Sequence, residues 1–208
     1  MKLVLALWLG YFLGAIPTAY IAGRLLKDID IRKHGSGNVG ATNVFRVLGK
    51  GPGIVVLVLD ILKGVLAVTL VGDIFGLTQV GQRVLLALAA VAGHNWTVFL
   101  DFKGGKGIAT SLGALIGLTI KIAFIRPVLL FTLLTWLAVF LATGFVSLAS
   151  IVASVFLPII MALTGQEFPL VVLGVILCVF VVVRHRPTIK RLWEGQESRI
   201  SLPYFKKK

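Results

Sequence analysis

Seven apolar segments, each close to the length that crosses a bilayer, leave this chain few possible folds. Crossing the hydrocarbon core takes a helix of roughly 17–25 apolar residues, and a chain in lipid must satisfy its backbone hydrogen bonds internally. Only 14% of the residues are charged, whereas a soluble domain carries about 25%. The sequence therefore predicts an all-α polytopic membrane protein, a single domain over 1–208, with seven transmembrane helices at about 3–23, 52–72, 83–100, 108–124, 127–143, 145–163 and 168–183.

The first apolar segment resembles a secretory signal peptide, because Lys2 precedes a long apolar run. That run stays apolar as far as Ala22, which is longer than a typical signal core, and basic residues follow it from Arg24 onward. We therefore expect a retained first span.

Basic residues are distributed unequally between the two sides that seven spans would create. Sixteen fall in 24–51, 101–107 and the tail 184–208, and four fall on the opposite side. Because Lys and Arg collect in cytoplasmic loops, we place the N-terminus outside and the basic tail in the cytoplasm. The same bias explains the net charge of +13. No nucleic-acid-binding module is recognisable, so we expect no nucleic acid partner.

The first cytoplasmic loop carries a polar, glycine-rich stretch from Gly35 to Arg46. Its glycines match a dinucleotide fingerprint in spacing, but no strand precedes them, so we reject that interpretation. Glycines let backbone N–H groups converge on an anion, and Arg46 offers a planar fork suited to phosphate. We therefore predict an anion site here, with these further members: Ser36, Gly37, Asn38, Gly40, Thr42 and Asn43.

A second glycine-rich loop lies on the same side and reads Lys103-Gly104-Gly105-Lys106-Gly107. It is not a Walker motif, because Gly107 stands where Ser or Thr is needed. The loop leads into the fourth span, whose N-terminal dipole end favours anions. We predict a second phosphate site built from Lys103, Lys106 and the backbone amides of Gly104, Gly105 and Gly107.

Charged and titratable residues inside the apolar segments are few. Asp60 and Lys63 stand at i, i+3 in the second span, where charges are costly, so we expect a buried bracing pair or a direct functional role. His94 and Asn95 lie near the expected cytoplasmic end of the third span, and we expect them to support the site. Three dispersed histidines and few carboxylates predict no metal, and the lone Cys178 offers no disulfide.

Together the motifs resemble the three cytoplasmic motifs of the PlsY family, the bacterial acyl-phosphate:glycerol-3-phosphate acyltransferases. The first runs from Ser36 to Arg46, the second from Gly93-His94 to Gly107, and the third from Arg184-His185 to Glu197. Asp60-x-x-Lys63-Gly64 matches as well, so the resemblance covers nearly the whole chain. One departure is Thr188, which stands where the family has Asn, so that here a hydroxyl or another group must do the work of that amide.

The resemblance implies transfer of a fatty acyl group from acyl phosphate to the 1-hydroxyl of glycerol 3-phosphate. The products are lysophosphatidate and inorganic phosphate, in the first step of phospholipid synthesis. It also implies a multi-pass protein of the bacterial cytoplasmic (inner) membrane, with its active site facing the cytoplasm and without a cofactor. The expected partners are acyl phosphate, glycerol 3-phosphate, membrane lipid and the soluble enzyme that makes the acyl phosphate.

The family motifs suggest residue roles and leave some of them open. Ser36, Arg46 and His185 are the catalytic candidates, and the proton acceptor is either His185 or the donor phosphate. Thr188 joins the phosphate-binding set, and Glu197 orders the tail by pairing with Arg46, Arg191 or a backbone N–H. An organic-phosphate transporter is the alternative, because transporter sites lie near mid-membrane like Asp60 and Lys63, although no inverted repeat is visible. A purely structural subunit would leave the glycine-rich loops unexplained.

Overall fold

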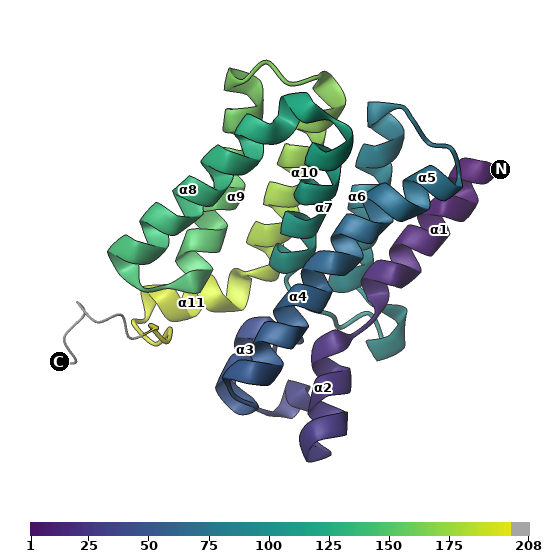
Figure 1. Cartoon of the computed structure of the whole chain (residues 1–208). Helices are drawn as coiled ribbons and strands as arrows, with labels where there is room; N and C mark the ends of the chain where they lie inside the picture. The colour runs from purple at the N-terminus through teal and green to yellow at the C-terminus, as the bar shows by residue number, and fades with distance from the viewer. Residues whose placement is uncertain (201–208) are drawn as a thin grey trace. The chain divides into compact units, whose positions relative to one another are not determined.

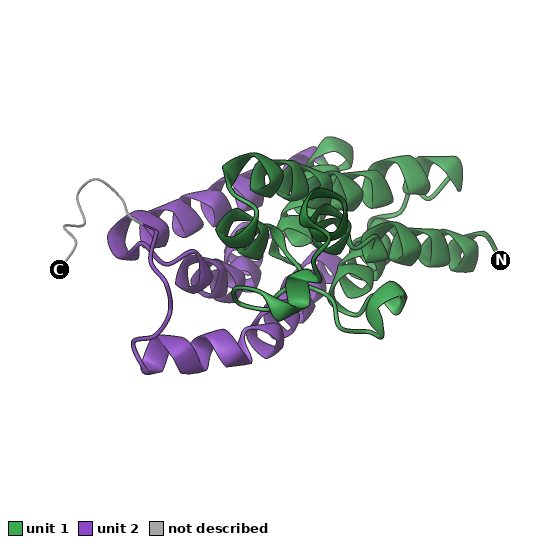
Figure 2. Cartoon of the chain, turned by 90° about the horizontal axis from the view of Figure 1, so that it is seen from below, with its two compact units in different colours: residues 1–122 green, residues 123–208 purple. Residues whose placement is uncertain are grey.

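The structure is a computed structural model that describes residues 1–200, and all of its regular secondary structure over that range is helical. It comprises two compact units, Met1–Ile122 and a second unit that begins at Ala123 (Figure 2). The helices of the first unit are α1 (Lys2–Ala15), α2 (Thr18–Lys27), α3 (Ala41–Val47), α4 (Lys50–Leu66), α5 (Gly72–Ile74), α6 (Val80–Asn95) and α7 (Ile108–Lys121). Those of the second are α8 (Arg126–Thr143), α9 (Val146–Leu163), α10 (Phe168–Arg184) and α11 (Arg186–Trp193).

Five stretches of the described chain are long and apolar enough to cross a membrane: Lys2–Lys27, Lys50–Ile74, Val80–Leu100, Ala123–Thr143 and Val146–Leu163. A sixth arises if α10 and α11, which bend by 60° at their junction, count as one span. The predicted span at 108–124 is the short apolar helix α7. The prediction of an all-helical membrane fold is confirmed, whereas seven crossings, their orientation and the single domain stay predictions.

Close helix contacts build the first unit. Helix α1 packs on α6 and helix α4 packs on α7 (Figure 1). Glycines lie where these backbones approach: a Cβ at Gly14 would fall 2.6 Å from the carbonyl carbon of Ala90, and one at Gly113 would fall 2.8 Å from that of Ile61. In lipid, where the hydrophobic effect between helices is absent, small residues allow such van der Waals packing.

The span predicted at 3–23 falls within the apolar stretch Lys2–Lys27, but its helix is interrupted at Ile16 and Pro17. Helix α1 ends at Ala15 and α2 begins at Thr18. Proline has no N–H to donate and its ring clashes with the preceding turn. The backbone carbonyls near the break therefore need donors from elsewhere, and this need shapes the functional site.

Two basic side chains of the first unit meet at Asp73. Arg83, 6% exposed, donates to the carbonyl of Val68 at 2.6 Å and to Asp73 Oδ1 at 2.7 Å. Val68 belongs to a π-helix, Ala67–Val71, a feature that disturbs the regular hydrogen-bond ladder. Lys121 pairs with the same Asp73. Arg83 and Lys121, which the sequence analysis places on the less basic side of the membrane, therefore share one carboxylate.

The second unit is built from α8, α9 and α10, which pack in sequence order. Pro127 and Pro169 fall in the first turns of α8 and α10, where a missing N–H is tolerated. Gly144 ends α8 with a φ of 74°. The predicted basic tail 184–208 is not irregular throughout, because α11 occupies its first part, and its Lys206–Lys208 run lies outside the described residues.

Candidate functional site

The first motif forms a tight turn ahead of α3, with Gly35 and Gly37 at positive φ. Asn43 is fully buried and ties this turn together. Its side-chain oxygen accepts the N–H of Ser36 at 2.8 Å, and its Nδ2 donates to the carbonyls of His34 and Ile31 at 3.0 and 3.2 Å. The structure therefore uses Asn43, which the sequence suggests as a ligand donor, to shape the loop.

Other members of the first motif face outward. Ser36, Thr42 and Arg46 are exposed, and Asn38 is half-buried. Arg46 lies on α3, four residues after Thr42, so the two are neighbours on one helical face. These side chains therefore lie at the surface of the first unit.

An ion pair anchors the chain just before this motif. Asp30 accepts the N–H of Arg32 at 3.0 Å and pairs with its guanidinium, Nη2 to Oδ2, at 2.7 Å. The hydrogen bonds from Arg32 lower the pKa of Asp30 from 3.8 to about 2. Asp30 therefore stays ionised at any physiological pH and keeps the short helix Ile31–Lys33 in place.

The second motif folds back onto the end of α6. The N–H of Gly104 donates to the Asn95 carbonyl at 3.2 Å, and that of Gly105 donates to the His94 carbonyl at 3.0 Å. A Cβ at Gly104 would fall 2.9 Å from the carbonyl oxygen of Asn95, and one at Gly105 would strike the His94 ring. The glycines are thus needed for close approach, and two of the amides predicted to hold phosphate already have protein acceptors.

What the second motif presents to a ligand is the start of α7. The first N–H groups of any helix lack partners within that helix, and here Gly107 precedes them with a φ of 77°. Lys103 is exposed and Lys106 half-buried at this end. Asn95 is fully buried beside Gly107, and neither atom of its amide has a hydrogen-bond partner within residues 1–200.

Asp60 and Lys63 form the buried pair that the sequence predicts, with Nζ 2.8 Å from Oδ1. Their exposures are 1% and 4%. His94, expected to be a supporting residue, places its Nδ1 3.6 Å from the same oxygen. Thr18, which the sequence analysis missed, donates its hydroxyl to that oxygen at 2.7 Å.

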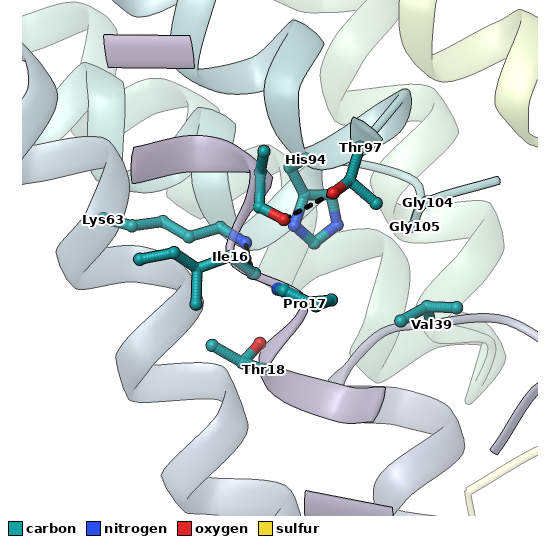
Figure 3. Close-up of a pocket in the computed structure, with 10 residues that line it drawn as sticks. Ile16, Pro17, Thr18, Val39, Lys63, His94, Thr97, Gly104 and Gly105 are labelled. Carbon is teal, nitrogen blue, oxygen red and sulfur yellow. Dashed lines mark hydrogen bonds between the residues drawn. The ribbon is translucent and has the colours of Figure 1, made fainter. Parts of the chain in front are cut away.

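The break at Pro17 faces this group of residues. Lys63 donates to the Ile16 carbonyl at 3.0 Å, and the Thr97 hydroxyl donates to the Ala15 carbonyl at 2.6 Å. Figure 3 shows Lys63, His94 and Thr97 around the interrupted helix. Thr97 was also missed; the available signal was Pro17, because a proline within a span leaves carbonyls that need side-chain donors.

The first and second motifs meet within the first unit. The carbonyl of Val39 lies 2.6 Å from where a Cβ of Gly105 would stand. Between them is a cavity of about 10 Å³, room for a single water molecule. Its lining includes Thr18, Val39, Lys63, His94, Gly104 and Gly105 (Figure 3).

The third motif belongs to the second unit, where α10 bends into α11. His185 is 2% exposed and its Nδ1 lies 2.8 Å from the Val181 carbonyl. A carbonyl can only accept, so Nδ1 carries the proton and Nε2 of the neutral ring bears the lone pair. In the neutral form of the ring, this hydrogen bond makes Nε2 the atom that would accept a proton.

Glu197 orders the end of the described tail. Its Oε2 accepts from Arg191 Nε at 2.8 Å and its Oε1 accepts from the Ser147 hydroxyl at 3.1 Å. Arg191 also donates to Thr188 Oγ1 at 3.0 Å. Of the three partners suggested for Glu197, the structure shows Arg191, and it adds Ser147. Among residues 1–200 no group of three His, Cys, Asp or Glu residues could hold a metal.

The fold and the site define an all-helical membrane protein whose glycine-rich and basic loops suit phosphate groups. The family model described as glycerol-3-phosphate acyltransferase matches residues 4–195. This chain belongs to that family.

Relatives of the same description match along almost their full length. The glycerol-3-phosphate acyltransferase of Desulforudis audaxviator (strain MP104C) is 46% identical over 202 residues, which cover 97% of each chain. That of Synechococcus sp. (strain CC9902) is 48% identical over 197 residues, covering 95% of this chain and 94% of the relative.

Two solved structures are similar to this chain. Both are crystal structures of PlsY (YgiH), an integral membrane glycerol 3-phosphate acyltransferase, and both are 36% identical, covering 97% of this chain and 96% of theirs. The glycerol 3-phosphate form matches with a TM-score of 0.86, and the lysophosphatidic acid form with 0.83.

Proposed function

We propose that this chain transfers a fatty acyl group from an acyl phosphate to the 1-hydroxyl of glycerol 3-phosphate. Family membership makes it an acyltransferase that acts on glycerol 3-phosphate in phospholipid synthesis. The acyl-phosphate donor and the position of attack are the finer parts of the proposal. The observation that carries it is the close contact between the two glycine-rich motifs within the first unit.

The absence of a His-x4-Asp signature supports acyl phosphate, and not acyl-CoA, as the acyl donor. Enzymes that use acyl-CoA commonly carry a His-x4-Asp signature, but the fifth residues after His34, His94 and His185 are Val39, Phe99 and Lys190. Acyl phosphate is a mixed anhydride with a good leaving group, so no covalent enzyme intermediate is required. The hydroxyl oxygen forms a bond to the acyl carbon, the bond from that carbon to the phosphate oxygen breaks, and inorganic phosphate leaves.

The main task of such a site is to hold two repelling phosphates and align a hydroxyl with a carbonyl. Holding reactants in this way supplies much of the catalysis of two-substrate reactions, and preorganised donors stabilise the charge that develops. We assign one phosphate to Lys103, Lys106 and the first turn of α7, with Asn95 beside it. We assign the other phosphate, or the attacking alcohol, to Ser36, Asn38 and Arg46.

The proton of the attacking hydroxyl goes to His185 Nε2 or to an oxygen of the donor phosphate. The tautomer of His185 supports the first route. His185→Ala separates the two: a large fall in kcat with loss of the acidic limb of the pH profile assigns the base to His185. A modest fall with an unchanged profile assigns it to the donor phosphate.

We further propose seven crossings, with α7 and the bent α10 among them, in the bacterial inner membrane with the three motifs in the cytoplasm. The support is the excess of Lys and Arg on one side. Single cysteines at position 38 and at the exposed position 190 of the third motif, in a chain with Cys178→Ala, test this in intact cells and inverted vesicles. Both should react with an impermeant thiol reagent from the cytoplasmic side only, and labelling from opposite faces would contradict the topology.

The activity is tested with purified protein in detergent. Phosphate release should require both acyl phosphate and glycerol 3-phosphate, and acyl-CoA in place of acyl phosphate should support no acyl transfer. Formation of lysophosphatidate with acyl-CoA as the sole donor would overturn the donor assignment. The transporter alternative is not favoured, because the comparisons identify an acyltransferase family.

A further inference from the structure

Four polar side chains from three helices meet next to the Gly104–Gly105 turn, and we name them the Asp60 cluster: Thr18, Asp60, Lys63 and His94. The three titratable members are at most 7% exposed. Charges in a membrane-spanning segment are expensive and usually functional, and a buried ion pair by itself adds little stability. Because burying these charges is unfavourable, we expect the cluster to have a role in function as well as in helix packing.

Asp60 is the centre of the cluster. A single oxygen, Oδ1, accepts the Thr18 hydroxyl at 2.7 Å, lies 2.8 Å from Lys63 Nζ, and lies 3.6 Å from His94 Nδ1. Its three partners come from the start of α2, the same face of α4, and the last turn of α6. One carboxylate therefore fixes the distances between three helices.

The cluster reaches the Gly104–Gly105 turn through His94. The carbonyl of His94 accepts the Gly105 N–H at 3.0 Å, while its ring faces the α-carbon of Gly105 closely enough to exclude any side chain there. His94 thus holds Gly105 through its backbone and limits its position through its ring. Because the Asp60 carboxylate is the ionic neighbour of that ring, we expect a change at Asp60 to alter the position of the turn.

The cluster does not itself reach a substrate. The cavity between Lys63, His94 and the turn measures about 10 Å³, enough for one water molecule and far too small for glycerol 3-phosphate or an acyl phosphate. An effect of these residues on the reaction is therefore indirect, and the Gly104–Gly105 turn is the part of the second glycine-rich loop that borders the same cavity.

We propose that the Asp60 cluster positions the Gly104–Gly105 turn, and that it thereby sets the affinity for the substrate phosphate bound by the second motif. Asp60, His94 and Thr18 are positioning residues on this view, and none of them acts as acid or base. The inference rests on the proposed function, since it concerns the phosphate site assigned above.

The test compares two carboxylates of the same unit, Asp60 with three donor or cationic neighbours and Asp73 with two. Asp60→Asn keeps the shape and removes the charge. Its matched control is Asp73→Asn, which removes the carboxylate that pairs with Arg83 and Lys121. For each variant kcat, the KM of both substrates, the pH profile and the melting temperature are measured, and glycerol 3-phosphate binding to the wild type is followed by calorimetry.

Asp60→Asn should raise the KM of one phosphate substrate by about tenfold or more, because hydrogen bonds to charged groups contribute roughly 1.5–3 kcal/mol. The pH profile should not move and kcat should change less than KM. Asp73→Asn should lower the melting temperature and leave both KM values unchanged. Should Asp60→Asn not fold, Thr18→Val removes one donor without a charge change and should raise the same KM about threefold to tenfold, while Thr18→Ser restores it.

Three results would overturn the positioning role. Unchanged KM values in Asp60→Asn and Thr18→Val would make the cluster purely structural. A fall in kcat with a shifted pH profile would make it part of the chemistry, and an equal KM rise in Asp73→Asn would make the effect unspecific. By contrast, a wild type that binds glycerol 3-phosphate but releases no phosphate would overturn the proposed function instead.

Discussion

Gly105→Ala is the substitution for which the structure predicts the sharpest loss. Gly105 is outside the positive-φ region, so alanine meets no backbone strain there. Its Cβ would stand 2.6 Å from the Val39 carbonyl oxygen, where an ordinary contact needs 3.4 Å, and it would also strike the His94 ring. The two motifs must separate by about 0.8 Å, the difference between those two distances.

A displacement of this size is large for a site that acts by alignment. A misplacement of about 1 Å can cost roughly 100-fold in rate, which equals about 2.7 kcal/mol of transition-state stabilisation. We therefore expect kcat/KM for glycerol 3-phosphate to fall about 100-fold in Gly105→Ala, measured as phosphate release in detergent with saturating acyl phosphate.

Gly81→Ala is the matched control, because a Cβ there meets nothing within 4 Å and the backbone is helical. It should keep wild-type activity, and by raising helix propensity it should stabilise the protein by up to about 1 kcal/mol. A Gly105→Ala enzyme that retained kcat/KM within about threefold of wild type would refute the reasoning, because contact between the two motifs would then not determine how the substrates are aligned.

Three further perturbations test the fold around the site. Gly113→Ala should lower the melting temperature in detergent by several degrees. Its Cβ would lie 2.8 Å from the Ile61 carbonyl carbon, and overpacking costs about 1–3 kcal/mol. An unchanged melting temperature would contradict the close α4–α7 contact. Thr188→Val should reduce kcat, because it removes the oxygen that accepts a hydrogen bond from Arg191. Thr188→Asn, which keeps a polar acceptor, should restore kcat. Equal losses of kcat in both variants would show that this acceptor does not affect the reaction. Asp30→Asn should lower the stability of the protein at neutral pH. The stability difference from wild type should vanish as the pH falls from about 4 to about 2, because a lowered pKa stabilises the folded state only while the group is ionised. A difference that persisted in acid would exclude the Arg32 pair as its cause.

The sequence predicts the membrane class and the existence of the site well, because both depend on local features. Apolar length identifies most of the spanning helices, and the excess of glycine and basic residues marks the two loops of the first unit. The Asp60–Lys63 pair follows from a spacing of three residues on a helix. These inferences need only neighbouring residues.

The structural reason for each glycine could not be predicted from neighbouring residues in the same way. A glycine in a loop permits either a converging set of amides or a close approach by another backbone, and the sequence does not distinguish them. At Gly104 and Gly105 the neighbour that fills the space is the end of α6, about ten residues earlier in the chain. Only the fold shows that these amides serve α6 and that ligand donors must come from the start of α7.

The break at Pro17 explains why the buried charges of α4 lie where they do. A helix interrupted inside a membrane leaves carbonyls that lipid cannot satisfy, and each unsatisfied group costs several kcal/mol. The carbonyl of Ile16 accepts the Thr18 N–H at 3.0 Å and the Lys63 ammonium at 3.0 Å, and the charge of Lys63 is balanced by Asp60. Asp60 in turn recruits Thr18, the first residue after the break, and His94, which holds the Gly105 turn. The charged cluster thus lies against the break at Pro17 and connects that break to the Gly104–Gly105 turn of the second motif.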